Sequence, residues 1–152
     1  MLRTRLNDEL KLAMKAKDSC RTSTLRLILA ALKDRDIAAR SKDNADGIGD
    51  DEILSMLQTM VKQRKESITM YEKGGRDELA AREAEEIDVI KDFLPSQLSE
   101  EETAAAVGEI ITETEAAGLK DMGRTMAELR SRYAGRMDFS VASEIVKSQL
   151  GG

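Results

Sequence analysis

Residues 91–102, KDFLPSQLSEEE, contain the only proline of the 152-residue chain and divide its predicted helices into two groups. Proline disfavours helical geometry at the preceding residue, Leu94, and cannot donate a helical hydrogen bond, so Pro95 predicts the end of one helix. Ser99 is followed three residues later by Glu102, a capping-box pattern that predicts the start of the next helix. We therefore expect a domain boundary at Leu94-Pro95, with one domain over residues 1–94 and another over residues 95–152.

The composition on both sides of the proline favours helices. Aromatic residues make up 3% of the chain, the hydrophobic class 41% and charged residues 35%, which is typical of amphipathic helices rather than of a sheet. Apolar spacing, glycines and caps predict helices at about residues 2–17, 20–40, 50–73, 76–93, 100–117 and 121–133, and a last one that ends near residue 150. The fold class is therefore all-α, with an N-terminal four-helix domain and a small C-terminal three-helix domain.

The helix at residues 20–40 is expected to be the most buried of the N-terminal domain. Its segment RLILAALK is apolar almost all round, because Leu25, Leu29 and Leu32 point one way and Leu27 points the other. The following residues, 41–50, are rich in Asp, Gly and Asn and predict a mobile, solvated loop.

The net charge of −5 is distributed unevenly along the chain. Residues 1–42 carry 11 basic and 5 acidic residues, residues 43–118 carry 7 and 20, and residues 119–152 carry 6 and 4. This pattern excludes a uniformly basic nucleic-acid-binding protein but leaves room for a local basic site at either end.

Several classes of site are not indicated. The chain has no histidine and a single cysteine, Cys20, which excludes the usual zinc sites and an internal disulfide. Glycine-rich nucleotide-binding patterns are missing, and no apolar run reaches the length of a membrane span. The N-terminus lacks the apolar core of a signal peptide, so a cytoplasmic location is expected. We expect no metal, no cofactor and no catalytic residue. Cys20 lies at a helix start, which can lower a thiol pKa, but a small buried side chain is the favoured interpretation.

One buried ion pair is predicted in the middle of the chain. Arg64 falls on the apolar face of the helix at residues 50–73, and Glu83 and Glu86 fall on the apolar face of the next helix. In an antiparallel hairpin turning at Gly74-Gly75, Arg64 lies level with a position near residue 85. Because an unpaired buried charge is costly, we expect Arg64 to pair with Glu86 or with Glu83, in a structural rather than a catalytic role.

A set of residues spread along the chain resembles a known family. They are Lys62, Gln63, Arg64, Ser67, Tyr71, Glu72, Gly75, Arg76, Leu79, Glu83, Glu86, Leu94, Pro95, Gln97 and Leu98, followed by Lys120, Asp121, Met122, Gly123, Gly135 and Arg136. In these residues the chain resembles the YqeY family, which is related to the C-terminal tail of the B subunit of glutamyl/aspartyl-tRNA amidotransferase. The resemblance implies an all-helical, two-domain protein linked to tRNA.

The basic residues of the C-terminal domain give a candidate nucleic-acid-binding site. Lys120 and Arg136 lie at predicted helix ends, and Gly123 and Gly135 would let a phosphate approach the backbone. Taken with the resemblance, the candidate residues are Lys120, Gly123, Arg124, Gly135, Arg136 and Lys147. The implied partner is tRNA, bound weakly and by shape, together with an aminoacyl-tRNA synthetase or amidotransferase complex.

Three functions remain open from the sequence. The first is a non-catalytic tRNA-associated accessory protein. The second is a carbon-nitrogen ligase of the amidotransferase type with glutamine as the amide donor, although the chain has no credible glutaminase nucleophile. The third is a protein-interaction adaptor that uses the acidic middle of the chain.

Overall fold

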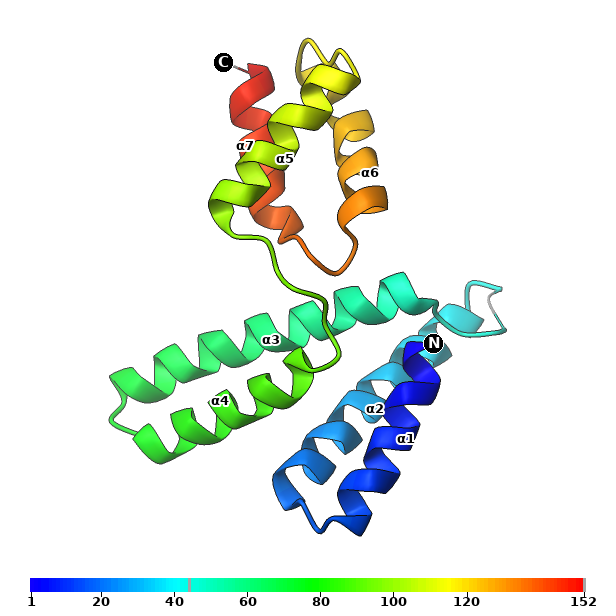
Figure 1. Cartoon of the computed structure of the whole chain (residues 1–152), viewed down its shortest axis with the longest axis vertical. Helices are drawn as coiled ribbons and strands as arrows, with labels where there is room; N and C mark the ends of the chain where they lie inside the picture. Colours follow the sequence, from blue (N-terminus) through cyan, green and yellow to red (C-terminus); the bar gives the residue numbers. More distant parts are fainter. Residues whose placement is uncertain (44, 152) are drawn as a thin grey trace. The chain divides into compact units, whose positions relative to one another are not determined.

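The computed structural model describes residues 1–43 and 45–151, and in this part of the chain it confirms the all-α class. The helices are α1 (Leu2–Lys15), α2 (Ser19–Arg40), α3 (Asp50–Lys73), α4 (Asp77–Lys91), α5 (Glu100–Glu113), a 3-10 turn η1 (Leu119–Asp121), α6 (Met122–Tyr133) and α7 (Phe139–Gly151) (Figure 1). Asn44, in the predicted loop at residues 41–50, lies outside the described residues.

The chain divides into two compact units, Met1–Leu94 and Pro95–Gly152, at the bond where the proline predicts a boundary. Ser99 caps α5 through its side chain, which accepts a hydrogen bond from the Glu102 backbone N–H, while the Glu102 carboxylate accepts one from the Ser99 N–H. The capping box therefore forms as predicted.

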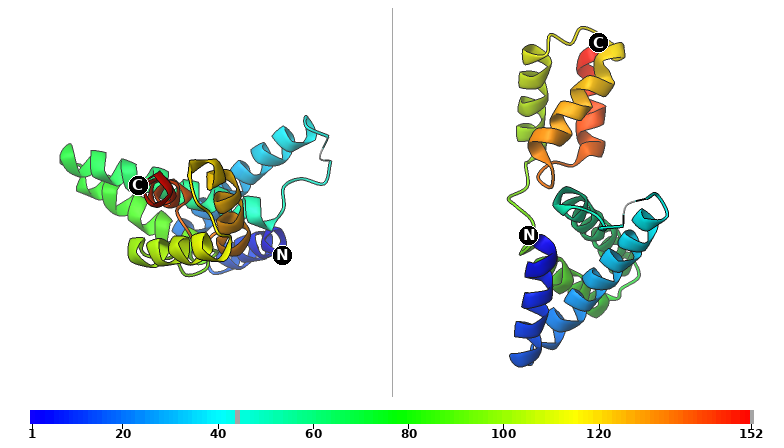
Figure 2. Two further views of the ribbon diagram at one scale, coloured as in Figure 1. Left: turned by 90° about the horizontal axis from the view of Figure 1, so that it is seen from above. Right: turned by 90° about the vertical axis from the view of Figure 1, so that its right-hand side faces the viewer.

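The N-terminal unit consists of two helical hairpins, α1–α2 and α3–α4. Figures 1 and 2 show α3 and α4 side by side, and the two hairpins meet where α2 contacts α3 and α4. The turn between α3 and α4 closes through Gly75, whose φ is 73°, and through the Arg76 N–H, which donates to the Tyr71 carbonyl. This is the glycine-dependent helix end that Gly74-Gly75 predicts. The core of the unit includes Leu6, Leu25, Leu57 and Ile90, which are fully buried.

The C-terminal unit packs α5, α6 and α7 around a second, smaller core. Val107, Ile110, Leu129, Met137 and Val146 are fully buried there. Asp138 caps α7, since its carboxylate accepts hydrogen bonds from the backbone N–H groups of Ser140 and Val141. Figure 2 shows the three helices of this unit surrounding a common interior.

Some helix ends differ from the prediction. The fifth helix ends at Glu113, not near residue 117, because Glu115 adopts a left-handed φ of 53° and the Ala116 N–H donates back to the Ile111 carbonyl. A left-handed non-glycine residue is uncommon, so Gly118 was the more obvious stop signal in the sequence. The first helix ends at Lys15, again before a left-handed residue, Lys17, with a φ of 57°.

The prediction that α2 is the most buried helix of the N-terminal unit was wrong, because four of its 22 residues are buried, as against four of the 15 residues of α4. One face of α2 packs in the core through Thr24, Leu25, Ile28 and Leu32, but Leu27 is 46% exposed. The end of the loop at residues 41–50, which was expected to be mobile and solvated, packs against the N-terminal unit. Ile48 is buried, its N–H donates to Asp36, and its carbonyl accepts from Arg3.

Candidate nucleic-acid interface

Three of the six candidate residues come together where α6 begins. Lys120 belongs to η1 and is exposed, and Gly123 and Arg124 follow in the first turn of α6. A Cβ atom added at Gly123 would meet no heavy atom within 4 Å apart from its chain neighbours and the backbone of its own helix, so this side of the helix is open to a ligand. The start of a helix beside cations suits a phosphate, although η1 runs directly into α6 and the Met122 N–H already donates to the Leu119 carbonyl.

Asp121 works against this positive end. Its carboxylate accepts a hydrogen bond from the Ala117 N–H, and Arg124 Nη2 lies 3.3 Å from Asp121 Oδ1. The backbone hydrogen bond from Ala117, followed by the charges of Arg124 and Lys120, lowers the pKa of Asp121. Asp121 therefore stays ionised and offsets one of the two positive charges at the start of α6.

Lys147 lies at the same end of the unit. It is exposed on α7, one turn before Gly151. A Cβ added at Gly151 would lie 3.6 Å from Leu119 Cδ2, so the end of α7 packs against η1. Lys120, Gly123, Arg124 and Lys147 thus define one weakly basic end of the C-terminal unit, which we call the η1 end.

Gly135 and Arg136 have a different role from the one the sequence suggested. Gly135 is buried with a φ of 77°, so it is required for its backbone conformation and not for the approach of a phosphate. Its carbonyl accepts a hydrogen bond from Gln97 Nε2 at 2.6 Å. The Arg136 carbonyl accepts from the Leu98 N–H at 2.8 Å, and Arg136 Nε donates to the Ser96 carbonyl at 3.2 Å.

These contacts tie the segment before α5 to the turn between α6 and α7. Gln97 also donates to the Pro95 carbonyl. The motif residues Pro95, Gln97, Leu98, Gly135 and Arg136 thus form one structural connection within the C-terminal unit. The sequence marks each of them in the family pattern, but the contacts of residues 96–98 with Gly135 and Arg136 bridge 38 or more residues and carry no local signal.

The remaining arginines of the C-terminal unit are held by other side chains. Arg132 pairs with Glu113 at 2.7 Å and with Glu128 at 2.8 Å. The Arg130 guanidinium lies over the Phe139 ring, 5.8 Å from its centroid. Neither side chain was among the candidate residues.

The predicted ion pair between the two long helices of the N-terminal unit is present. Arg64 Nε lies 2.9 Å from Glu86 Oε2 and 3.9 Å from Glu83 Oε2, and the Arg64 side chain is only 13% exposed. Arg64 Nη1 also donates to the Met60 carbonyl. Burial and the neighbouring Glu86 charge raise the pKa of Glu83, and Arg64 only partly offsets them. The geometry is that of a structural ion pair between Arg64 and Glu86, with the Glu83 carboxylate as a more distant neighbour.

Cys20 is half-buried at the start of α2. Burial raises the pKa of its thiol, and contact with Glu85 raises it further. With burial and Glu85 both raising its pKa, the thiol is a weak nucleophile at neutral pH.

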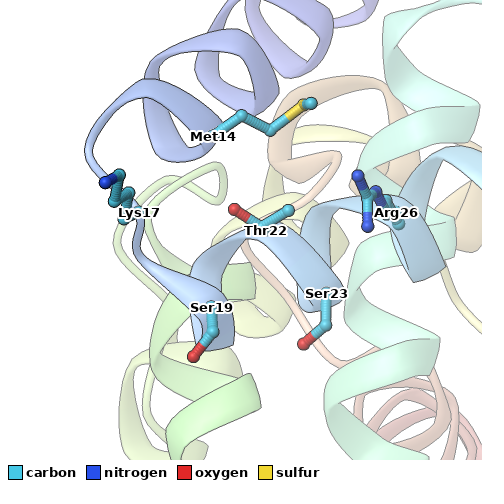
Figure 3. A pocket seen from close by; sticks show the side chains of 6 residues that line it. All are labelled: Met14, Lys17, Ser19, Thr22, Ser23 and Arg26. Atoms are coloured by element: carbon cyan, nitrogen blue, oxygen red, sulfur yellow. The ribbon is translucent and has the colours of Figure 1, made fainter.

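An open hollow lies beside Cys20 at the turn between α1 and α2. Met14, Lys17, Ser19, Thr22, Ser23 and Arg26 line it (Figure 3). Asp18 already caps α2 here by accepting a hydrogen bond from the Arg21 N–H.

In the described part of the chain, no three acidic or cysteine side chains gather closely enough to hold a metal ion. No helix among the described residues combines the length and apolar character needed to cross a bilayer.

The chain is similar to curated proteins of yeasts. It is 37% identical over 111 residues to altered inheritance of mitochondria protein 41, mitochondrial, of Lachancea thermotolerans, a match that covers 71% of this chain and 57% of the relative. The protein of the same name from Kluyveromyces lactis is 33% identical over the same length, with the same shares. That of Saccharomyces cerevisiae is 36% identical over 89 residues, covering 59% of this chain and 46% of the relative. The chain thus spans about half the length of these relatives.

These relatives correct the expected cytoplasmic location. They are named as mitochondrial proteins, which conflicts with an assignment to the cytoplasm alone. The expectation rested on the lone cysteine and the lack of an apolar segment, and neither feature separates the cytoplasm from the interior of an organelle.

The match to a protein family extends over nearly the whole sequence. The family described as Yqey-like protein matches residues 3–150, which include both units and every candidate residue. The chain belongs to the YqeY family.

Proposed function

We propose that this protein is a non-catalytic, tRNA-associated accessory protein that contacts the sugar-phosphate backbone through the η1 end of its C-terminal unit. The observation that carries the proposal is the open backbone at Gly123, flanked by the exposed cations Lys120 and Arg124. The resemblance to an amidotransferase tail supplies tRNA as the ligand. An aminoacyl-tRNA synthetase or amidotransferase complex is the protein context in which such a module would act.

The η1 end favours recognition of shape over recognition of sequence. Its groups are two lysines, an arginine and a helix start, which suit phosphate and sugar contacts and carry no base information. Asp121 stays charged between the cations, and the whole chain has a net charge of −5. Binding is therefore weak and falls steeply as salt is added.

A binding role is preferred to glutamine-dependent amide transfer for a chemical reason. Attack on the glutamine amide requires an activated nucleophile. Burial and Glu85 raise the pKa of the Cys20 thiol, which keeps the thiol protonated rather than activating it.

The test is a titration of the full-length protein with total tRNA at several salt concentrations. Lys120→Ala with Arg124→Ala is expected to weaken binding to many tRNAs alike, and each lost phosphate contact to lower the slope of log K against log salt by about 0.7–0.9. Lys33→Ala with Arg35→Ala, on exposed positions of α2, removes the same charge elsewhere and is expected to have the smaller effect. Equal effects of the two double variants would reject the η1 end.

A second pair of variants separates charge from shape. Gly123→Asp adds a carboxylate in the first turn of α6, where it suits the helix and meets no neighbour, and it is expected to reduce tRNA binding while α6 stays folded. Gly123→Ala adds a methyl group without charge and is expected to bind more tightly than Gly123→Asp. If Gly123→Asp binds tRNA as well as the wild type does, the proposal is wrong.

A further inference from the structure

The outward face of α2 has the spacing of a helix-pairing seam. Ser23, Leu27, Ala30, Asp34 and Ile37 follow one another at intervals of four and three residues, and all five are exposed. Residues at this spacing lie along one side of a helix, as in the contact positions of a coiled coil. Leu27 is 46% exposed and Ile37 53% exposed. The opposite side of α2 is the one that packs in the core.

Cations line one edge of this seam. Arg26, Lys33 and Arg40 are exposed and recur every seven residues, which places them about 10.5 Å apart along the helix. The ion pairs of α2 within the described residues run instead through Arg21 and Asp36, which are held by Glu9, Asp92 and Arg3. The other edge carries Ala31 and Ala38 and no charge. The seam is therefore apolar with one basic flank.

We propose that this face of α2, the α2 seam, is a docking surface for an α-helix of another protein that carries an apolar stripe and acidic residues along one flank. Charges at flanking positions select the partner and its orientation in paired helices. A cationic row at seven-residue intervals is matched by a row of carboxylates at the same interval on a partner helix.

The small residues of the seam support a helix as the partner. Ala30 and Ser23 allow close approach between two backbones, while Leu27 and Ile37 supply apolar surface on either side of Ala30. RNA would use the three cations but would gain nothing from these two apolar side chains. Asp34, in the middle of the seam, favours a basic residue opposite it, and a single polar contact position of this kind fixes register.

The hollow in Figure 3 extends the α2 seam at its N-terminal end. Ser23 and Arg26 belong to both, and Met14 reaches over from α1. Met14 is 50% exposed, and its flexible thioether can adapt to a partner side chain. The docked helix would therefore contact the end of α1 as well as α2.

The experiment uses a designed three-heptad peptide and the full-length protein. The peptide has Leu at its contact positions, one Lys at the central contact position and Glu at its flanking positions; a matched peptide has Lys at the flanks. Fluorescence anisotropy of the labelled peptide, at concentrations too low for self-pairing, is expected to show saturable, salt-sensitive binding of the Glu-flanked peptide and no binding of the Lys-flanked one. Failure of the Glu-flanked peptide to bind would overturn the proposal.

Variants of exposed residues test the surface itself. Arg26→Glu with Lys33→Glu is expected to weaken binding of the Glu-flanked peptide by about 10- to 100-fold and to create binding of the Lys-flanked peptide. Leu27→Ser with Ile37→Ser is expected to abolish binding of the Glu-flanked peptide, since the charges remain but the apolar contact is lost. Lys62→Glu with Lys65→Glu, on exposed positions of α3, is the control for net charge and is expected to retain binding of the Glu-flanked peptide.

Two outcomes would count against the α2 seam. If the reversal at Arg26 and Lys33 lowers tRNA affinity but leaves peptide binding unchanged, the cations serve RNA and not a helix. If the control reversal on α3 weakens peptide binding as much as the reversal on α2, the attraction is one of net charge and the seam is not the site.

Discussion

Ion pairs of arginine side chains join the helices of the N-terminal unit, whereas hydrogen bonds to backbone carbonyls close the C-terminal unit. Arg64 connects α3 to α4, and Arg21 pairs with Glu9 of α1 and with Asp92 beyond α4. The guanidinium of Arg5 lies 4.8 Å from the centroid of the Phe93 ring and adds a further contact. In the C-terminal unit the main connection runs instead from residues 96–98 to Gly135 and Arg136.

The difference shows that a charged residue has to be interpreted by its burial. Arg64 and Arg132 each face two carboxylates, but the Arg64 side chain is 13% exposed and the Arg132 side chain 39%. Water screens the second arrangement far more than the first. In the C-terminal unit the conformation of one glycine is therefore expected to matter more than the ion pairs on its surface.

The largest expected effect is that of Arg64→Ala. The substitution leaves Glu83 and Glu86 close together without their cation and is expected to lower the free energy of unfolding of the α3–α4 hairpin by about 3 kcal/mol. Amide hydrogen exchange of the full-length protein, followed by mass spectrometry, measures this for each helix. Arg132→Ala is the control in the other unit and is expected to change exchange in α5–α7 little. Similar losses from both variants would remove the distinction between the two units.

The next effect is that of Gly135→Ala in the C-terminal unit. A non-glycine residue at a φ of 77° is expected to cost about 1–2 kcal/mol. Gly123→Ala is the matched control, because Gly123 lies in α6 with open space around it, and alanine there is expected to stabilise α6 by up to about 1 kcal/mol. The same substitution should thus change the stability of the C-terminal unit in opposite directions at the two glycines, as measured by amide exchange in α5–α7. A change of stability in the same direction for both variants would mean that Gly135 is not under conformational constraint.

The smallest effect concerns pH and the carboxylates of the N-terminal unit. Burial, and after it the charge of Glu86, raises the pKa of Glu83 above its ordinary 4.5. The folded state therefore holds the proton of Glu83 more tightly than the unfolded state does. This proton binding stabilises the fold fully below pH 4.5, and the stabilisation is lost as the pH rises through the raised pKa. The pKa of Asp36 is shifted in the opposite direction. The hydrogen bond from Arg3 lowers its pKa from the ordinary 3.8, and its contribution is lost as pH falls through the lowered value.

Glu83→Gln is therefore expected to raise the stability of the N-terminal unit slightly at neutral pH and to flatten its decline between pH 4.5 and neutrality. Denaturant unfolding followed by circular dichroism at a series of pH values measures this decline. Asp88→Gln, which changes an exposed carboxylate on the same helix, is the control. An unchanged pH profile in Glu83→Gln would show that Glu83 is not strained by its neighbours.

The sequence by itself determined the helices, the boundary and one ion pair. Pro95, Gly75 and the capping box of Ser99 with Glu102 act on their immediate neighbours, so their consequences can be read without knowing the rest of the fold. The pair of Arg64 with Glu86 could also be predicted, because a single tight turn between two regular helices fixes which positions face each other. Of the candidate interface, Lys120, Gly123 and Arg124 were named from local pattern together with the family resemblance.

Only the tertiary structure decided the rest. Gly135 and Arg136 resembled a phosphate-binding turn until Gln97, 38 residues away, was seen to hold the carbonyl of Gly135. The helix α2 was expected to be the most buried of its unit because its middle segment is apolar almost all round, but α1, α3 and α4 cover only one side of it. In both cases the outcome depends on which distant segments meet, and local spacing carries no information about that.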